Sequence, residues 1–413
     1  MSDPVYGLLG RTLGHSYSPA IHAALGDTAY RLIELEPEEL PAFLARPDIG
    51  GLNVTIPYKK DVLPFCDSVS DSVRRIGAAN TLVRRNGKLQ AYNTDKPGFI
   101  TMTHSAGISL KGAKVLVLGT GGASRAVIAG LEDMGAADII SISRTGENNY
   151  QNLDRHADAD VIVNTTPVGM YPNVLQSPLS LDGFPRLRGV LDVIYNPART
   201  GLLLQAEERG IPCAGGLTML VAQAVKSHCI FFNTEVPDGT VASIVHDLRV
   251  QEENIILIGM PGSGKTTIAA ELGARTGKPV VDLDAEIEKA AGMSIPSLFA
   301  EKGEPAFRDL ESEQIARFGA KSGQILSMGG GAVLREENYL PLHQNGRIYW
   351  LQRSLDALPM DGRPLSRDRA ALEKMYQERE SLYARFSDAV IVNDSTPQHV
   401  AQAILDDYAL AQL

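Results

Sequence analysis

A glycine-rich loop near the middle of the chain has the composition of a phosphate-binding loop. Residues 259–267 read Gly-Met-Pro-Gly-Ser-Gly-Lys-Thr-Thr and follow the apolar run 254–258, so they match GxxxxGK[ST] between a strand and a helix. In such a loop the backbone amides hold phosphate oxygens, Lys265 reaches the β- and γ-phosphates, and Thr266 can ligate Mg²⁺. The loop therefore predicts a nucleoside triphosphate site, without indicating which reaction takes place there.

A second glycine-rich turn, residues 119–126, follows the apolar run 115–118 and precedes an amphipathic stretch. Strand, glycine turn and helix are the context of a dinucleotide-binding fingerprint, although Ser124 occupies the place of its third glycine. The next strand ends at Ser143-Arg144-Thr145. An NAD site usually carries a carboxylate at this position, whereas Arg144 can pair with a 2′-phosphate. The pattern favours NADP over NAD, and the alternatives are an ordinary tight turn and a solvated loop arginine.

Polar residues of the first hundred positions suggest a site for a small hydroxylated acid. Ser16 and Ser18 lie at a strand-to-helix turn, where hydroxyls and helix amides suit a carboxylate. Lys59 follows a strand, and Asp95 follows the hairpin strands. A lysine can protonate an oxygen that gains charge, and an aspartate can orient the hydroxyl and stabilise the ammonium. Taken singly, each of these residues is more often a capping or surface residue.

Two carboxylates come directly after the phosphate-binding loop and its helix. The run 279–284 predicts a strand that places Asp282 and Asp284 on one face, because side chains alternate along a strand. One carboxylate can serve the metal sphere, and the other can accept a proton from an attacking hydroxyl. Further along, arginines suited to forked contacts with carboxylate or phosphate stand beside a glycine run at 329–331. The alternatives are a solvated charged surface and a flexible turn.

The elements that must position these residues follow an α/β pattern. Short apolar runs, apolar on both faces and separated by helix-length segments, predict parallel strands in βαβ units. A hairpin is expected over 79–92, turning on Asn86-Gly87. The predicted strands are 5–9, 31–35, 51–56, 115–118, 139–143, 160–164, 190–195 and 255–258.

The chain divides into three predicted blocks. Residues 1–104 form a substrate-binding domain and residues 105–249 a nucleotide-binding domain whose C-terminal helices can pack back on the first. A polar linker is expected at 250–253, after a helix over 236–253, and a third domain covers 254–413.

Composition narrows the function further. The chain has 413 residues, 44% of them hydrophobic, with 39 Lys and Arg against 49 Asp and Glu, for a formal charge of −10. This balance argues against non-specific binding to nucleic acid or to an anionic membrane. Three widely spaced cysteines and the absence of HExxH predict a reduced, cytoplasmic chain without a zinc catalyst. No apolar run approaches the roughly 20 residues that span a bilayer, and the N-terminus does not resemble a signal peptide.

Over about residues 4–249 the sequence resembles the shikimate dehydrogenase family. The resemblance is carried, in order, by HSYSP, NVTIPYKK, GAANTL, NTD, GTGGASRA, SRT, NTTPVGM, DVIYNPARTGLL and GGLTMLVAQ. It implies Lys59 and Asp95 as the catalytic residues. It implies that the substrate, shikimate or 3-dehydroshikimate, is bound by Ser16, Ser18, Asn53, Thr55, Lys59, Asn80, Asp95, Tyr195 and Gln223. It implies that NADP(H) is held by a Rossmann domain through Gly119, Gly121, Gly122, Ala123, Ser143, Arg144, Thr145, Val193 and Gly216.

Over about residues 254–413 the sequence resembles shikimate kinase, a P-loop fold related to the nucleoside monophosphate kinases with a parallel sheet. The motifs are the phosphate-binding loop, DLD, FR, MGGG, GRP and ERESLY. The resemblance implies that ATP is bound by Gly262, Ser263, Gly264, Lys265, Thr266, Thr267 and Arg363. It implies that shikimate is bound by Asp284, Arg308, Gly330 and Arg379, with Asp284 as the catalytic base. Thr266 and Asp282 would hold Mg²⁺, partly through water.

Together the two resemblances imply one bifunctional enzyme of aromatic amino-acid biosynthesis. Its first half would reduce 3-dehydroshikimate with NADPH, and its second half would phosphorylate the resulting shikimate with ATP and Mg²⁺. Its expected partners are these small molecules, with no nucleic acid or membrane, and homo-oligomer formation is left open. The alternatives are a quinate/shikimate dehydrogenase with a weakly active or regulatory kinase half, and a nucleotide-sensing or scaffold protein.

Overall fold

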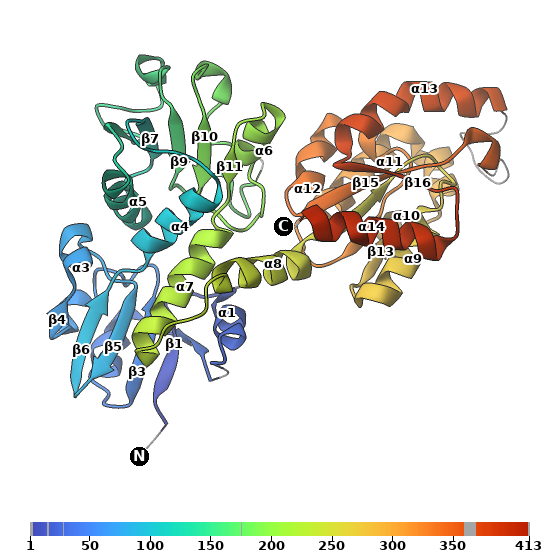
Figure 1. Cartoon of the computed structure of the whole chain (residues 1–413). Helices are drawn as coiled ribbons and strands as arrows, with labels where there is room; N and C mark the ends of the chain where they lie inside the picture. The colour runs from blue at the N-terminus through green and yellow to red at the C-terminus, as the bar shows by residue number, and fades with distance from the viewer. Residues whose placement is uncertain (1–2, 15, 28, 175, 359–368, 412–413) are drawn as a thin grey trace. The chain divides into compact units, whose positions relative to one another are not determined.

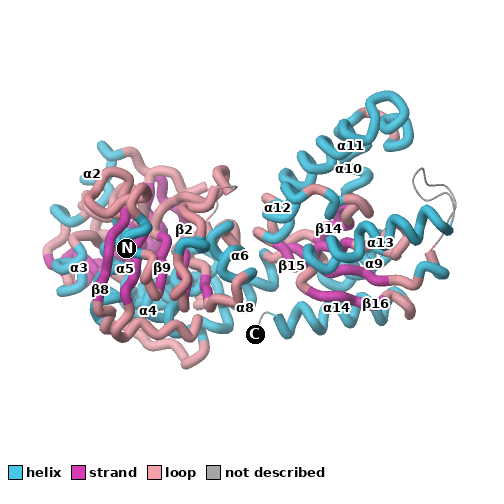
Figure 2. The backbone as a smooth tube through the Cα atoms, turned by 90° about the horizontal axis from the view of Figure 1, so that it is seen from above, coloured by secondary structure: helices cyan, strands magenta, loops and turns pink. Residues whose placement is uncertain are grey.

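The computed structural model describes residues 3–14, 16–27, 29–174, 176–358 and 369–411. The chain forms two compact units, residues 1–245 and 246–413, and the described residues form three β-sheets. Figure 1 shows their strands and helices. The colouring of Figure 2 shows helices lying over the strands in both units. The α/β class expected from the sequence is therefore confirmed. Within the described ranges, no helix combines the length and apolar character needed to cross a bilayer.

The first sheet of unit 1 is mixed. Its six strands are ordered β2-β1-β3-β5-β6-β4, with β1 parallel to β2 and β3 and with β5 antiparallel to both β3 and β6. The predicted hairpin is confirmed, and both of its turn residues, Asn86 and Gly87, have positive φ. The strand bounds are β1 Val5–Gly10, β2 Arg31–Glu34, β3 Ile49–Val54, β4 Ser68–Val69, β5 Thr81–Arg85 and β6 Lys88–Tyr92. The helices are α1 Ser18–Ala24, α2 Leu40–Leu44 and α3 Asp71–Ile76.

The second sheet of unit 1 is parallel, with the order β11-β10-β9-β7-β8. Strand β7 pairs with β8 on one side and with β9 on the other, so the chain reverses its direction of winding between β7 and β9. Ligands of open parallel sheets bind at such a switch point, beyond the carboxyl ends of the strands. The strands are β7 Lys114–Leu118, β8 Asp138–Ile142, β9 Val161–Asn164, β10 Gly189–Asp192 and β11 Cys213–Ala214. The helices are α4 Asp95–Ser105, α5 Gly122–Asp133, α6 Gly201–Glu208 and α7 Leu217–Phe232.

Helices α4 and α7 join the two lobes of unit 1. A Cβ atom added to Gly98 of α4 would lie 2.7 Å from the backbone carbonyl oxygen of Met219 in α7, so glycine sets how closely the two helices approach. Charged contacts add to this junction. Asp133 of α5 accepts from Arg75 at 2.6 Å and from Lys96 at 2.5 Å. The functional residues on both lobes are therefore held by one packed layer of helices.

The strands described in unit 2 form one parallel sheet with the order β13-β14-β12-β15-β16. Its strands are β12 Asn254–Ile258, β13 Val280–Asp282, β14 Ile325–Ser327, β15 Gly346–Gln352 and β16 Ala389–Val392. Helix α8, Thr240–Glu252, begins in unit 1 and ends in unit 2. The other helices are α9 Lys265–Thr276, α10 Leu283–Ala291, α11 Ile295–Gly319, α12 Tyr339–His343, α13 Arg369–Phe386 and α14 Pro397–Ala411. The strand predicted over 279–284 is shorter than expected, because α10 begins at Leu283 with Asp282 as its cap: the Asp282 carboxylate accepts from the Ala285 amide.

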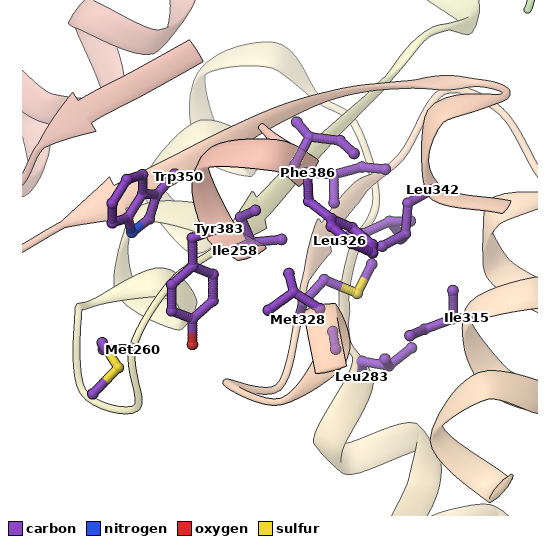
Figure 3. Close-up of a cluster of buried hydrophobic side chains, with 14 of the residues drawn as sticks. Ile258, Met260, Leu283, Ile315, Leu326, Met328, Leu342, Trp350, Tyr383 and Phe386 are labelled. Atoms are coloured by element: carbon purple, nitrogen blue, oxygen red, sulfur yellow. The ribbon is translucent and has the colours of Figure 1, made fainter. Parts of the chain in front are cut away.

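Hydrophobic clusters fill both faces of this sheet. Figure 3 shows the larger one, in which Leu326, Met328, Leu342 and Phe386 pack with Trp350 and Tyr383. The second cluster lies on the opposite face and includes Ile268, Leu272, Ile404 and Tyr408 from α9 and α14. The strands alternate between the two clusters, so β12 is buried along its whole length. A rigid central strand therefore carries the loop that follows it.

The linker expected at 250–253 coincides with the last turn of α8 and the residue after it. Unit 2 holds this turn through hydrogen bonds to its carbonyl oxygens. The Lys278 ammonium donates to the carbonyl oxygens of Gln251 and Glu253 at 2.8 and 3.0 Å. The Gly323 amide donates to that of Glu252 at 2.7 Å.

We expect Gly98→Ala to destabilise unit 1 alone. The added methyl group would collide with backbone, and overpacking of this kind costs about 1–3 kcal/mol, more than the roughly 1 kcal/mol that alanine adds in helix propensity. The only tryptophan, Trp350, lies in unit 2, so the unfolding transition that its fluorescence reports should keep its midpoint temperature. The far-ultraviolet circular dichroism, which reports both units, should begin to lose signal at a lower temperature. Gly183→Ala, where a Cβ would meet nothing within 4 Å, is the matched control. An unchanged or higher unfolding temperature of Gly98→Ala would contradict the packing argument.

Candidate active sites

Lys59 and Asp95 form an ion pair in unit 1, with 2.6 Å between Nζ and Oδ2. Lys59 follows β3, and Asp95 is the first residue of α4. The other carboxylate oxygen, Oδ1, accepts a hydrogen bond from the Asn80 amide at 2.9 Å. The side chains of Lys59 and Asp95 are 21% and 10% exposed, so the pair is partly desolvated yet open on one side. This arrangement presents an ammonium held in place by a carboxylate, as proton transfer to a bound oxygen requires.

Of the other predicted residues, Gln223 contacts Asn80 beside this pair, whereas Ser16 and Ser18 lie at the start of α1 and Tyr195 follows β10. The Gln223 side-chain oxygen on α7 accepts from the Asn80 amide at 3.3 Å. Ser16 accepts from the Ser18 amide at 3.2 Å, at the start of α1. The neighbouring Tyr17 ring lies 5.5 Å from the ring of Tyr195, which follows β10. Burial raises the pKa of Tyr195, so it stays a neutral hydrogen-bonding group.

Two of the residues expected to bind substrate lie at the end of β3. Thr55 follows the strand, is partly exposed, and its amide donates to the carbonyl of Leu9. Asn53, by contrast, is only 4% exposed and its amide group is bonded to protein atoms on every side. Asn53 therefore lies beneath the group of polar residues, and direct contact with substrate remains a prediction that this geometry does not favour.

A cavity of about 700 Å³ lies at the switch point of the parallel sheet in unit 1. Its walls come from the loops after β7, β8 and β9: Gly119, Gly121, Ser143, Arg144, Tyr150 and Thr165 are among the lining residues. A Cβ at Gly121 or Gly122 would meet nothing within 4 Å, so space for a ligand adjoins the amino end of α5. None of the described lining residues is acidic. These features fit a pyrophosphate at the helix terminus and a 2′-phosphate beside Arg144.

The remaining residues predicted for NADP do not line this cavity. Gly122, Ala123 and Thr145 adjoin its lining residues in sequence, whereas Val193 and Gly216 lie together farther along the strand ends. A Cβ at Gly216 would lie 2.1 Å from the carbonyl oxygen of Val193, so these two loops touch through backbone. Beside them the buried carboxylate of Asp192 accepts from the Ile194 amide and the Thr200 hydroxyl, and burial raises the pKa of Asp192 to about 6.

The phosphate-binding loop of unit 2 lies between β12 and α9. Gly264 has φ +96°, a conformation that favours glycine, and directly precedes the helix. Lys265 Nζ donates to the carbonyl oxygens of Gly259 and Met260 at 2.9 and 3.0 Å, so its ammonium lies along the inside of the loop. The Thr266 hydroxyl donates to Asp282 at 3.0 Å. The buried Ser263 can contribute only through its backbone, because its side chain is enclosed.

Both predicted carboxylates of unit 2 line the same cavity of about 530 Å³, although not for the reason expected. Asp282 ends β13 and Asp284 lies in the first turn of α10, so the helix and not strand alternation brings them together. Withdrawal from bulk water, with a smaller contribution from the Asp282 charge, raises the pKa of Asp284. A carboxylate with a raised pKa is a better proton acceptor than an ordinary aspartate.

Two buried arginines face Asp284 across this cavity. Arg308 pairs with Glu311 at 2.6 Å, and Arg379 donates to the carbonyl oxygen of Gly330 at 2.8 Å. The glycine run threads between these groups: a Cβ at Gly331 would lie 2.1 Å from the Arg308 guanidinium. The run is thus fixed by close packing rather than being a flexible turn. The three charged side chains predicted for this site, Asp284, Arg308 and Arg379, form with Glu311 a charge-balanced cluster that can accept an anion.

Sequence reasoning missed several residues of this region. Glu311 lies one helical turn after Arg308, and this i, i+3 spacing was a usable signal. Arg353 lines both the main cavity and an adjoining one of about 370 Å³, where Asn393 holds the Ser263 carbonyl at 2.6 Å. No local pattern marks these two residues. Arg363, predicted to reach ATP, lies outside the described residues.

Unit 1 thus has the fold and cavity of a nucleotide-dependent oxidoreductase, and unit 2 those of a P-loop phosphotransferase. The family model described as shikimate dehydrogenase substrate binding domain matches residues 8–82, and the shikimate kinase family model matches residues 261–409. Two curated relatives are NADP⁺-dependent shikimate dehydrogenases. That of Caldicellulosiruptor bescii is 40% identical over 256 residues, covering 55% of this chain and 88% of the relative. That of Geobacillus kaustophilus is 40% identical over 250 residues, covering 54% and 90%.

Solved structures agree over the same part of the chain. A chorismate mutase/shikimate 5-dehydrogenase fusion protein from Clostridium acetobutylicum is 35% identical with a TM-score of 0.58, covering 60% of this chain and 98% of that one. The Thermus thermophilus shikimate 5-dehydrogenase in complex with NADP(H) and shikimate is 32% identical with a TM-score of 0.54, covering 58% and 98%. The chain belongs to the shikimate dehydrogenase family and carries a shikimate kinase domain at residues 261–409.

Proposed function

We propose that this chain is a bifunctional enzyme that reduces 3-dehydroshikimate to shikimate with NADPH and then phosphorylates shikimate with ATP. The observation that carries the proposal is the presence, in one polypeptide, of the Lys59–Asp95 pair and of a phosphate-binding loop facing Asp284 and two arginines. The two reactions share shikimate as product and substrate. The three unpaired cysteines suit the reducing cytoplasm as its location.

In the reduction, Lys59 supplies the proton and Asp95 holds its ammonium in position. NADPH, when bound in the cavity at the switch point, supplies hydride to the ring carbonyl carbon. As the carbonyl oxygen gains negative charge, Lys59 Nζ donates a proton to it, which completes the hydroxyl of shikimate. Asn80 keeps Asp95 oriented through the 2.9 Å hydrogen bond, and Ser16, Ser18 and Thr55 offer hydroxyls to the ring acid's carboxylate.

In the phosphorylation, Asp284 accepts the proton of the attacking shikimate hydroxyl, and Arg308 and Arg379 hold the carboxylate of the acid. Lys265 and the loop amides bind the phosphates of ATP, and the adjoining cavity beside Arg353 and Asn393 accommodates the base. Mg²⁺, bound with ATP, neutralises phosphate charge. Among the described residues no cluster of three His, Cys, Asp or Glu could hold a metal by itself, so Thr266 and Asp282 would share it with phosphate and water.

One incubation tests the proposal directly. The chain is mixed with 3-dehydroshikimate, NADPH, ATP and Mg²⁺, and each cofactor is omitted in turn. We expect shikimate 3-phosphate with all components, shikimate alone without ATP, and no product without NADPH. Replacing NADPH by NADH should slow the first reaction. Failure to form shikimate, or failure to phosphorylate added shikimate, would contradict the corresponding half of the proposal.

Lys59→Ala should lower kcat for reduction by about 10²–10⁴-fold, because general acid catalysis contributes on this scale, while shikimate binding changes little. Steady-state kinetics and calorimetric titration with shikimate measure the two effects. Lys60→Ala, at the exposed neighbouring position, is the matched control. The kinase rate should be unchanged in both variants, and a parallel loss of kinase activity in a folded protein would be inconsistent with independent sites.

Lys265→Ala should abolish phosphorylation and leave reduction intact. The ammonium lies inside the loop, where Gly259 and Met260 hold it through their carbonyl oxygens and where phosphate oxygens would bind. The measurement is ATP-dependent shikimate 3-phosphate formation beside NADPH oxidation in the same sample. Lys289→Ala, at an exposed position of α10, serves as control and should retain both activities.

The raised pKa of Asp284 predicts the acid side of the kinase pH profile. A base is active when ionised, so its activity is lost as pH falls through its pKa, and raising that pKa moves the loss to higher pH. Asp282→Asn removes a like charge and should move the acid limb of kcat/KM to lower pH, whatever it does to the maximal rate. Glu288→Gln, which removes a weaker like charge, should produce a smaller shift in the same direction. Opposite or absent shifts in both variants would argue against Asp284 as the base.

A further inference from the structure

A buried polar cluster lies beneath the Lys59–Asp95 pair. It joins β3, β5, the start of α4 and α7, and each member is at most 4% exposed: Asn53, Asn80, Thr81, Thr94 and Ser227. Burying polar side chains is costly unless all of them are hydrogen-bonded, so the stability of this cluster depends on its internal hydrogen bonds.

Every polar atom of the Asn53 side chain has a protein partner. Its Oδ1 accepts from the Tyr30 hydroxyl at 2.8 Å and lies 3.2 Å from His22 Nε2. Burial lowers the pKa of His22 to about 4, so the ring is neutral; the tautomer with its proton on Nε2 donates to Asn53 Oδ1, and Nδ1 lies 3.7 Å from Asp27 Oδ2. The His22 and Tyr30 rings stack with centroids 3.8 Å apart, which fixes both donors. The other end, Nδ2, donates to Ser227 Oγ at 2.7 Å.

The hydroxyl of Ser227 has its donor and acceptor roles fixed by its hydrogen bonds. Its hydroxyl donates to the Gln223 carbonyl oxygen at 2.8 Å, one helical turn earlier, so its oxygen is an acceptor for the surrounding groups. The hydroxyls of Thr81 and Thr94 lie 3.0 and 3.2 Å from it. Both threonines also contact the Asn80 amide, and the Thr94 backbone N–H donates to Asn80 Oδ1 at 2.7 Å.

The Oδ1 atom of Asn80 is thus bonded within the cluster. Its Nδ2 group links the cluster to the ion pair by donating to Asp95 Oδ1. The hydrogen bonds form a continuous network. It begins at His22 and Tyr30 and passes through Asn53, Ser227 and the two threonines. It ends at Asn80, Asp95 and Lys59. It crosses from the first lobe to α7 and back, linking residues as far apart in sequence as Asn53 and Ser227.

We propose that Asn53 is a positioning residue that acts through Ser227, the two threonines and Asn80 on the orientation of Asp95, and that it does not bind the substrate. The inference rests on the proposed dehydrogenase function. Removing Asn53 leaves Ser227 and Tyr30 without their common partner, so the amide of Asn80 and the carboxylate of Asp95 lose their fixed orientation while the substrate-facing hydroxyls stay in place.

The test compares Asn53→Ala with wild type in NADPH-dependent reduction and in shikimate binding. We expect kcat to fall by about tenfold or more while the dissociation constant of shikimate changes less than about threefold, since an interaction that matters only for the transition state moves kcat. In an Asp95→Asn background, Asn53→Ala should cause no further loss, because its effect ends at Asp95. A large rise in the dissociation constant with kcat preserved, or an additive loss in the double variant, would overturn the proposal.

Ser227→Ala provides a second variant in case Asn53→Ala does not fold, and it should lower kcat in the same direction by a smaller factor. Thr103→Val is the matched control, because its buried hydroxyl bonds only to the Phe99 carbonyl oxygen in α4 and lies outside the cluster. It should retain wild-type kcat, whereas Ser227→Ala with wild-type kcat would overturn the relay. If the wild-type chain itself reduces no 3-dehydroshikimate, the proposed function fails, which is distinct from a failure of the relay.

Discussion

Parallel strands bring their carboxyl ends to one edge of a sheet, and both nucleotide sites of this chain depend on that constraint. In unit 1 the loops after β7, β8 and β9 meet around one cavity, and in unit 2 those after β12, β13 and β14 do the same. Helices α5 and α9 begin at these edges, where unpaired amides carry partial positive charge. Anions are favoured at both edges for this reason, even though the chain as a whole is negatively charged.

In both sites, positively and negatively charged side chains lie near one another. In unit 1 the Lys59 ammonium faces the Asp95 carboxylate, and the side-chain amide of Asn80 donates to the remaining carboxylate oxygen. In unit 2 Arg308 and Arg379 line the same cavity as Asp284 and Glu311. Burial raises the pKa of Glu311, and the adjacent Arg308 opposes this rise. A bound acid adds charge to a site that is already organised, so little rearrangement is needed.

The sequence was informative wherever the chemistry resides in contiguous residues. Both glycine loops, the Asn86-Gly87 hairpin and the pairing of Lys59 with Asp95 could be read from motifs and their resemblances. Asp284 illustrates the limit: alternation predicted a strand, but Asp282 caps a helix of strong helix formers, and capping won over alternation. Contacts made by packing of distant elements, such as Asn53 with Ser227 or Asn393 with the loop at Ser263, leave no trace in local pattern. Such partners are set by how α7 or β16 docks, which single-sequence reasoning does not supply.

The two cavities of unit 2 have walls in common, since Gly264, Thr267 and Arg353 border both. A single elongated molecule, with a ring carboxylate at one end and a heterocycle at the other, could therefore occupy them together. Joining two weak fragments across a shared wall makes the second contact intramolecular, and avidity then rises without any new interaction. This geometry makes the second unit a natural starting point for linked inhibitors of bisubstrate type.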